Sequence, residues 1–238
     1  MRVAAIIPAA GLGTRMGKEA SEQFGTDRKQ FMLLGGVPIL VHTIRKFLAA
    51  PSVNEILVVV PAEDVSAMAA DLAVETDSKS VRVVAGGRNR QESVRNGLDV
   101  VSSGIDIVAV HDGVRPFISV ALIEDAIAKA AESGAVILGM PAVDTVKQVG
   151  QNAIEATLPR ERIMLAQTPQ VFRRELLDRA FEGAARDGFN GTDEASLVEH
   201  LNEDVHVMLG SDRNIKITRP SDMALAQLFY DEERPAAK

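Results

Sequence analysis

The chain has 238 residues, enough for one large domain or two small ones, and its 46% apolar and 25% charged residues are an ordinary balance for a soluble protein. The absence of cysteine excludes disulfides, thiol catalysis and zinc–thiolate or iron–sulfur sites, and favours a cytoplasmic location. The net charge of −7 argues against a general nucleic-acid-binding surface. No apolar run approaches the ~20 residues that a membrane span needs, and we expect no secretory signal before the first apolar run.

Short apolar runs alternate with helical stretches up to residue 140. Strands are predicted at 3–7, 55–60, 81–85, 106–112 and 135–140, and helices at 38–50, 63–72, 91–101 and 120–132. The strand runs are rich in valine and isoleucine without alternating polar residues, which is typical of strands buried on both faces of a parallel sheet. The repeated strand–helix order predicts an α/β fold built on a doubly wound, mostly parallel sheet.

Residues 144–158 break this alternation. They predict two short strands joined by a turn at 150–152, a hairpin inserted in the α/β pattern. Taken alone, this hairpin favours an extension at the edge of the main sheet over an arm that reaches another subunit. The remaining elements are helices at 173–188, 192–201 (capped by Thr192 or Asp193) and 221–230, a strand at 205–209, and a frayed tail from residue 231. We expect a single domain over residues 1–238.

Three polar or glycine-rich stretches follow predicted strands: "PAAGLG" from residue 8, "GGRNRQES" from residue 86 and "HDGVRP" from residue 111. Ligands of doubly wound folds bind at the carboxyl ends of the strands, so these stretches are expected to meet at one site. Glycine lets a backbone turn tightly and lets a ligand approach it closely. A glycine-rich turn after a strand often presents its N–H groups to phosphate.

The first loop does not match two common phosphate-binding motifs. A P-loop has four residues between its glycines, whereas Gly11 and Gly17 are separated by five, and Lys18 is followed by a glutamate instead of Ser or Thr. The dinucleotide fingerprint needs a small residue where Met16 stands, which disfavours a dinucleotide-dependent oxidoreductase.

A long glycine-rich loop carrying Arg15 and Lys29 would face Asp112 at another strand end. This combination suits nucleotidyl transfer, in which a phosphate oxygen attacks the α-phosphorus of a nucleoside triphosphate and pyrophosphate leaves in line. Cations would neutralise the accumulating charge, and a carboxylate would hold Mg²⁺ against the triphosphate. No general base is needed because the attacking phosphate is already an anion, which is consistent with only four histidines.

The motifs together resemble the 2-C-methyl-D-erythritol 4-phosphate cytidylyltransferases of the non-mevalonate isoprenoid pathway. "PAAGLGTRMG" alone indicates only the wider superfamily of Rossmann-like nucleotidyltransferases. The more specific motifs are "HDGVRP", "TPQ", "TDEAS" and "NIKITRP", supported by "RKQF", "GGRNRQESVRNGL" and "DTVK". The resemblance runs from residue 3 to about residue 229, in the order of the family.

The resemblance implies that CTP and methylerythritol 4-phosphate react to give the CDP-alcohol and pyrophosphate, with Mg²⁺ or another divalent cation held by Asp112. Arg15 and Lys29 would be catalytic, stabilising the pentacoordinate α-phosphate. The implied nucleotide-binding residues are Ala9, Ala10, Gly11, Gly13, Gly87, Ser93 and Asp112. The first four would offer backbone N–H groups to the triphosphate, and Gly87 and Ser93 would contact cytosine.

The resemblance also implies how the alcohol phosphate is bound. The implied residues are Arg115, Thr145, Arg160, Thr168, Thr192 and Lys216. Residues 143–164 would form a protruding β-arm that embraces a second subunit, so that Thr145 and Arg160 complete the partner's site in a homodimer. This replaces the edge-hairpin interpretation; no nucleic acid or membrane partner is expected. A pentitol-phosphate cytidylyltransferase acting on ribitol 5-phosphate, or a catalytically silent regulatory subunit, would share the nucleotide loop, and both remain alternatives.

Overall fold

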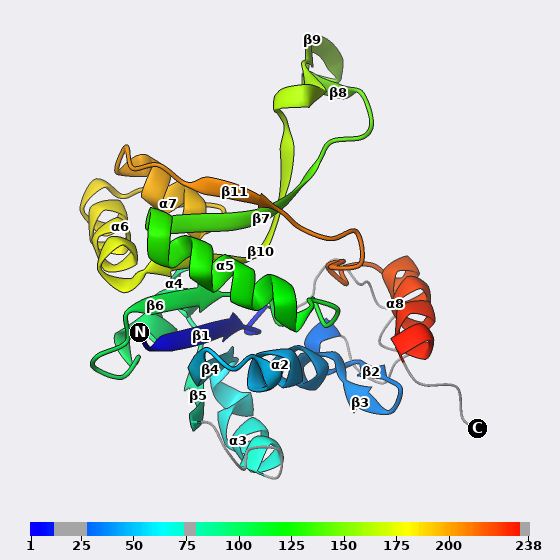
Figure 1. Cartoon of the computed structure of the whole chain (residues 1–238). Helices are drawn as coiled ribbons and strands as arrows, with labels where there is room; N and C mark the ends of the chain where they lie inside the picture. The colour runs from blue at the N-terminus through cyan, green and yellow to red at the C-terminus, as the bar shows by residue number, and fades with distance from the viewer. Residues whose placement is uncertain (12–27, 74–79, 234–238) are drawn as a thin grey trace.

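The computed structural model describes residues 1–11, 28–73 and 80–233, which form a layered α/β fold (Figure 1). The strands are β1 (Val3–Pro8), β2 (Leu33–Leu34), β3 (Val37–Pro38), β4 (Val53–Val60), β5 (Ser80–Ala85), β6 (Ile107–Val110), β7 (Ala135–Pro141), β8 (Val146–Gly150), β9 (Ala153–Leu158), β10 (Met164–Arg173) and β11 (His206–Leu209). The α-helices are α2 (Ile39–Ala49), α3 (Val65–Ala73), α4 (Arg90–Asp99), α5 (Val120–Ser133), α6 (Arg174–Asp187), α7 (Glu194–His200) and α8 (Pro220–Glu233). Short 3-10 helices are η2 (Lys29–Phe31), η3 (Ala62–Asp64) and η4 (Arg160–Arg162).

The central sheet has seven strands in the order β11-β7-β10-β6-β1-β4-β5. β1 pairs in parallel with β4 and β6, β4 with β5, and β7 with β11. β10 runs antiparallel to both of its neighbours, β6 and β7. The predicted mostly parallel, doubly wound sheet is therefore confirmed, with one antiparallel strand that was not predicted.

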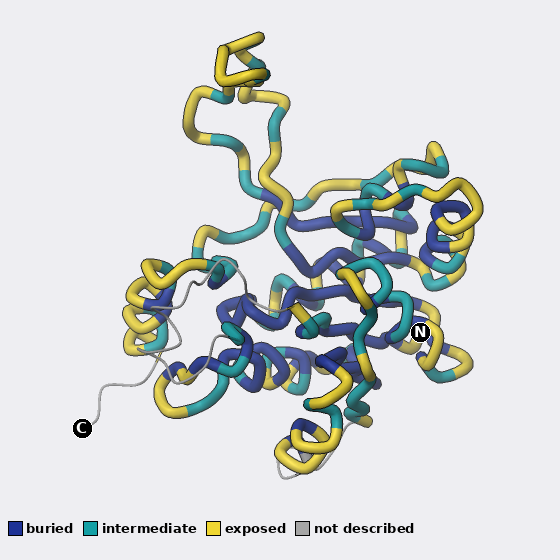
Figure 2. The backbone as a smooth tube through the Cα atoms, turned by 180° about the vertical axis from the view of Figure 1, so that it is seen from behind, coloured by how far each residue is buried: buried dark blue, intermediate teal, exposed yellow. Residues whose placement is uncertain are grey.

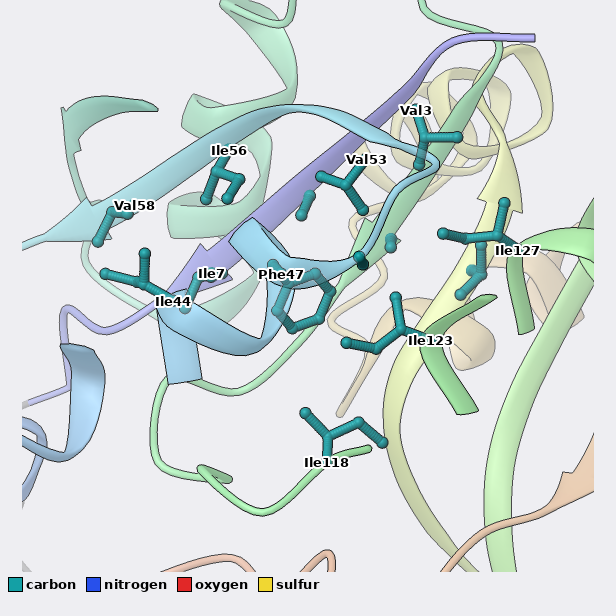
Figure 3. Close-up of a cluster of buried hydrophobic side chains, with 14 of the residues drawn as sticks. Val3, Ile7, Ile44, Phe47, Val53, Ile56, Val58, Ile118, Ile123 and Ile127 are labelled. Atoms are coloured by element: carbon teal, nitrogen blue, oxygen red, sulfur yellow. The ribbon is translucent and has the colours of Figure 1, made fainter. Parts of the chain in front are cut away.

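β1 is buried on both faces because each face of the sheet carries its own hydrophobic core. Val3, Ala5 and Ile7 pack in the core under α2 and α5, together with side chains such as Phe47 and Ile123 (Figure 3). The residues between them, Ala4 and Ile6, belong to the core on the opposite face, under α4, α6 and α7. Burying one valine or isoleucine side chain contributes about 1.5–3 kcal/mol, so a continuous apolar strand is well suited to this central place.

A third apolar cluster attaches the C-terminal part of the chain to the main body. Ile217, Met223 and Ala226 pack against residues such as Val114 and Phe117, which follow β6. The Ile217 N–H also donates to the Val114 carbonyl oxygen at 3.0 Å. These contacts fix the backbone on either side of Lys216 beside the end of β6.

Most predicted helices and strands lie within a few residues of their observed bounds. Pro38 caps α2 instead of lying inside it. α3 begins only at Val65, after η3. Residues 231–233, expected in a frayed tail, belong to α8, while the end of that tail lies outside the described residues. Among the described residues, no helix combines the length and apolar character of a membrane span.

The predicted hairpin is formed by β8 and β9, and it projects away from the body of the molecule (Figure 1). Gln151 and Asn152 form its turn with positive φ angles of 49° and 65°. The two strands make a separate sheet, so the hairpin does not extend the edge of the main one. It is mostly exposed (Figure 2), and its apolar side chains Val149 and Ile154 are each 64% exposed.

Candidate active site

A cavity of about 580 Å³ lies where β1, β4, β5 and β6 end. Hydrogen bonds continue from the sheet into the loops that follow. The Ala9 N–H donates to the Val59 carbonyl oxygen at 2.7 Å, and the Gly86 N–H to the Val60 carbonyl oxygen at 2.8 Å. The Gly113 N–H, after β6, donates to the Pro8 carbonyl oxygen at 3.3 Å. The loops after β1, β5 and β6 are thereby held at one edge of the sheet, as expected for a ligand site of this fold.

The structure brings part of the predicted site together. Eight of the predicted residues line the cavity: Ala9, Ala10, Gly11, Lys29, Gly87, Ser93, Asp112 and Lys216. Arg115, Thr145, Arg160, Thr168 and Thr192 are described but do not line it. Gly13 and Arg15 lie outside the described residues, as does Lys18.

Gln30 anchors the start of the glycine-rich loop. Its buried side-chain amide donates to the carbonyl oxygens of Ala9 at 2.8 Å and Gly11 at 3.3 Å. The Ala9 N–H is already used in the sheet, so the prediction that it donates to the triphosphate disagrees with the structure. Within the described part of the chain, the N–H groups of Ala10 and Gly11 have no backbone partner. Gln30 lies in the quoted motif "RKQF" but was not assigned from sequence.

The loop after β5 is fixed by its own hydrogen bonds. The Gly87 N–H donates to Ser93 Oγ at 3.1 Å, and the Ser93 hydroxyl donates to the Asn89 carbonyl oxygen at 2.8 Å. A Cβ atom on Gly86 would lie 2.4 Å from the Cβ of Ala10, so glycine is required where the loop after β5 meets the loop after β1. Ser93 therefore shapes the loop that was predicted to contact a base.

Asp112, which follows β6, is the centre of charge in the cavity. Its carboxylate oxygens lie 2.7 Å from Lys216 Nζ, 3.4 Å from Arg90 Nε and 3.5 Å from Arg115 Nε. Burial alone would raise the pKa of Asp112, but the charges of Arg90 and Lys216 outweigh it and hold that pKa below its ordinary value. The carboxylate is therefore ionised at neutral pH.

The described residues around the cavity can hold a magnesium ion only together with ligands from the substrate and water. Mg²⁺ is commonly bound by one or two carboxylates together with substrate phosphates and water. Within residues 1–11, 28–73 and 80–233, no group of three or more His, Cys, Asp or Glu side chains could hold a metal ion. The ionised Asp112 carboxylate in the cavity can supply one hard oxygen ligand, so the remaining ligands would come from a bound triphosphate and water.

Arg90 and Glu194 form a buried ion pair beside Asp112 that sequence reasoning missed. Arg90 Nη1 lies 2.7 Å from Glu194 Oε1, and the Glu194 residue is only 1% exposed. Burial disfavours the charge on Arg90, but Glu194 and Asp112 outweigh it and raise the pKa of Arg90 above its ordinary value. Both residues occur in motifs quoted above, "GGRNRQES" and "TDEAS", and motif membership was the only available signal for them.

Thr168 and His111 form a buried chain of hydrogen bonds that fixes Asp112. His111 Nε2 lies 3.1 Å from the Arg115 carbonyl oxygen, which can only accept, so Nε2 carries the hydrogen and Nδ1 accepts. The Thr168 hydroxyl, 3.1 Å from Nδ1, therefore donates to His111, while its oxygen accepts from the Asp112 N–H at 3.1 Å. The Thr168 hydroxyl therefore has no hydrogen left to donate to a phosphate. Its hydrogen bonds indicate that Thr168 positions Asp112 and does not contact the substrate.

The other residues predicted to bind the alcohol phosphate do not line the cavity. Arg115 is 8% exposed, and its Nη1 donates to the Asn214 carbonyl oxygen at 2.7 Å. Thr192 is exposed just before α7. Thr145 is exposed at the base of the hairpin, where Arg160 Nη1 donates to the Val143 carbonyl oxygen at 2.7 Å. Within this chain, Thr145 and Arg160 do not join the predicted site.

The buried His111 predicts that the protein loses stability in mild acid. Burial lowers the pKa of His111 to about 4, whereas an unfolded histidine titrates near 6.5. Between these values the unfolded chain binds the additional proton, so the free energy of unfolding should fall by about 2 kcal/mol from pH 7 to pH 5. Burial also lowers the pKa of His42, which acts in the same direction.

Urea unfolding of the wild-type protein and of His111→Gln at pH 7 and pH 5 measures this contribution. The variant is expected to be less stable at pH 7 but to lose much less stability on acidification. An equal loss in both proteins would contradict the assignment of a neutral, buried His111.

The fold and the residues that line the cavity together indicate a class of enzyme. A doubly wound sheet, a glycine-rich loop after its first strand, and an ionised aspartate among cations at the same sheet edge are the elements of a nucleotidyltransferase site. The sequence carries the glycine-rich stretch, and the described structure shows the sheet and the aspartate among cations.

Comparison with known proteins gives the family. The family model of 2-C-methyl-D-erythritol 4-phosphate cytidylyltransferase matches residues 3–232, and the chain belongs to this family. It is 57% identical over 237 residues to the protein of that name from Solibacter usitatus, covering 98% of this chain and 97% of that protein. It is 50% identical over 239 residues to the protein of the same name from Acidobacterium capsulatum, covering 98% and 99% of the two chains.

Solved structures agree with this assignment. The 4-diphosphocytidyl-2C-methyl-D-erythritol synthase of Anaerococcus prevotii matches with a TM-score of 0.82 at 29% identity, covering 97% of this chain and 98% of that one. The 2-C-methyl-D-erythritol 4-phosphate cytidylyltransferase of Francisella tularensis matches with a TM-score of 0.78 at 33% identity, covering 96% and 99%. The predicted family, fold class, enzyme class and reaction are confirmed, and the pentitol-phosphate and oxidoreductase alternatives receive no support.

Proposed function

We propose that the cavity around Asp112 binds CTP and that the chain transfers the cytidylyl group to 2-C-methyl-D-erythritol 4-phosphate, releasing pyrophosphate. The observation that carries this proposal is an ionised carboxylate lining a cavity of about 580 Å³ beside Arg90 and Lys216. Such a site can receive a triphosphate because the cations attract the phosphates while the carboxylate can bind a divalent cation.

The proposed reaction is an in-line displacement at phosphorus. An oxygen of the acceptor phosphate forms a bond to the α-phosphorus of CTP as the bond to the bridging oxygen of pyrophosphate breaks. Mg²⁺ held by Asp112 would neutralise charge on the triphosphate. Lys29 and Lys216 line the cavity and would bind phosphate oxygens. Arg15 is assigned to the α-phosphate from the family resemblance alone, because it lies outside the described residues.

Cytosine would be recognised by the loop between β5 and α4. The Gly87 N–H already donates to Ser93 Oγ, so we assign recognition of the cytosine amine to the Gly87 carbonyl oxygen. Uracil presents an oxygen at the same position, which would face this carbonyl without a hydrogen between them. A site built around one hydrogen bond rejects an analogue that lacks it because the buried group is left unpaired.

The proposal includes a homodimer joined through the arm at residues 143–164. The hairpin forms its own sheet and exposes Val143 by 79% and Val149 and Ile154 by 64% each, which suits contact with a second copy. Thr145 and Arg160 at its base would then reach the partner's acceptor phosphate. The absence of cysteine supports a cytoplasmic location for the enzyme.

Pyrophosphate release with CTP and Mg²⁺ tests the proposed function. Initial rates with 2-C-methyl-D-erythritol 4-phosphate should greatly exceed those with ribitol 5-phosphate, and UTP should replace CTP poorly. A preference for ribitol 5-phosphate would overturn the acceptor assignment while leaving the nucleotide site in place. No release with either acceptor would overturn the proposed reaction.

A further inference from the structure

We propose that Glu194 is a positioning residue that holds Arg90 so that Asp112 is available to a divalent cation. The inference rests on the proposed function, because it concerns how the same cavity receives a metal–triphosphate complex. Glu194 itself does not line the cavity, and among the described residues its ion-pair partner is Arg90, which does.

Arg90 is shared between two carboxylates. Its Nε lies 3.4 Å from Asp112 Oδ1, whereas its Nη1 lies 2.7 Å from Glu194 Oε1. The shorter contact is to the carboxylate that is more deeply buried, with 1% of the Glu194 side chain exposed against 10% for Asp112. The Arg90 guanidinium therefore interacts more closely with Glu194 than with Asp112, and it neutralises the charge of Asp112 only in part.

The Glu194 backbone is held rigidly, so it can act as a fixed anchor. Glu194 is the first residue of α7, and its neighbour Asp193 forms a capping box with Ser196. Gln170 of β10 accepts from the Ala195 N–H at 3.0 Å and donates to Asp193 Oδ2 at 2.7 Å. Glu194 Oε2 is buried without a hydrogen-bond partner in the described structure, so Oε1 with Arg90 supplies the carboxylate's hydrogen bonding.

The three cations around Asp112 differ in what else holds them. Arg90 is anchored by Glu194, and Arg115 by the Asn214 carbonyl oxygen at 2.7 Å. Within the described residues, Asp112 is the one ion-pair partner of Lys216. When a metal ion binds to Asp112, the two arginines can keep their places, and Lys216 is released to bind a phosphate.

Removing the charge of Glu194 should therefore change metal binding. Of its two carboxylate partners, Arg90 would then keep only Asp112. The positive charge of Arg90 would compete with the metal ion for the Asp112 carboxylate oxygens. Groups that orient a metal ligand typically change metal affinity by 10–100-fold when they are altered. The expected direction is weaker metal binding in Glu194→Gln, although Glu194 does not touch the metal.

The test is a titration of Mn²⁺ into the full-length protein with an equimolar amount of CTP, followed by the electron paramagnetic resonance signal of free Mn²⁺, with the binding of Mn²⁺ to CTP alone measured separately and subtracted. Glu194→Gln should weaken Mn²⁺ binding by about tenfold. The matched control is Asp99→Asn, which removes an exposed carboxylate paired with Arg95 at the other end of α4 and should bind Mn²⁺ as the wild type does. Unchanged Mn²⁺ affinity in Glu194→Gln would overturn the inference.

A second-site variant distinguishes positioning from a general structural effect. In Arg90→Met/Glu194→Gln the guanidinium of Arg90 can no longer compete for Asp112, and the buried pair is replaced by two neutral side chains. This double variant should bind Mn²⁺ more tightly than Glu194→Gln alone, because Arg90 no longer competes for the Asp112 carboxylate. If Glu194→Gln weakens binding only by disturbing α7, the second substitution will not restore it, and the inference fails.

The same titration separates this inference from the proposed function. Asp112→Asn should abolish tight Mn²⁺ binding if Asp112 is the metal ligand. If Asp112→Asn binds Mn²⁺ like the wild type, the proposed metal site and the inference both fail. If Asp112→Asn loses Mn²⁺ while Glu194→Gln keeps it, the proposed site stands and only the role of Glu194 is overturned.

Discussion

Replacing Asp112 by asparagine is expected to lower kcat/KM for pyrophosphate release by about a thousandfold, because an amide neither binds the divalent cation as a carboxylate does nor balances the surrounding cations. In the wild type, that carboxylate lies 2.7 Å from Lys216 and 3.4 Å from Arg90. A continuous assay of pyrophosphate release with CTP and 2-C-methyl-D-erythritol 4-phosphate measures the loss.

Two controls make this result specific. Thermal melting should show that Asp112→Asn is folded, and Asp99→Asn should keep wild-type kinetics, since Asp99 is an exposed residue of α4 paired with Arg95. A decrease in kcat/KM of less than tenfold in the folded Asp112→Asn variant would show that Asp112 is not central to the mechanism.

The second large effect is expected at the base of the arm. Arg160→Ala should raise the KM for the acceptor phosphate by about a hundredfold and change the KM for CTP little, because loss of a hydrogen-bonded charge pair with a ligand costs about 2–3 kcal/mol. Within the chain Arg160 is exposed and donates to the Val143 carbonyl oxygen, and it does not line the cavity. An effect of Arg160 on binding of the acceptor phosphate would therefore have to occur at the site of another subunit. An equal increase in both KM values would contradict this role.

Mixing two impaired variants, assayed with the acceptor phosphate well below its wild-type KM, tests whether sites are shared. Asp112→Asn and Arg160→Ala protomers, unfolded and refolded together in equal amounts, should regain about a quarter of wild-type activity, since half of the random dimers are heterodimers with one intact site. A mixture of Asp112→Asn with Lys216→Met is the matched control, because both substitutions lie in the same cavity and no intact site can form. No recovery in the first mixture would overturn the shared-site dimer.

The regular part of the fold was predictable because local sequence and tertiary position agree. β1 is apolar at every position from 3 to 7, and the structure buries it between two cores. β10 was missed for a physical reason: Pro169 cannot donate a hydrogen bond to a ladder and argues against a central strand. The structure accommodates it with an irregular register between Gln167 and Gln170 in the pairing with β7.

From the residues alone, the candidate site was predictable where motifs lie at strand ends. Asp112 and the stretch that contains Gly87 were expected there because the ends of β6 and β5 meet at one sheet edge, whereas Lys216 was assigned only through the family resemblance. The partners that fix these residues come from distant parts of the chain: Arg90 and Glu194 are 104 residues apart. No spacing rule relates such positions, so the ion pair required the structure. The tautomer of His111 and the resulting role of Thr168 likewise depend on hydrogen-bond distances.

The central claim is that the cavity beside Asp112 binds the triphosphate of CTP together with a divalent cation. A crystal structure with CTP and Mn²⁺, with the metal located by its anomalous scattering, tests it most directly. We predict an anomalous peak about 2.1 Å from an Asp112 carboxylate oxygen, with cytosine against the loop at Gly87 and Ser93. An anomalous peak elsewhere, or a triphosphate bound outside this cavity, would contradict the proposed mechanism.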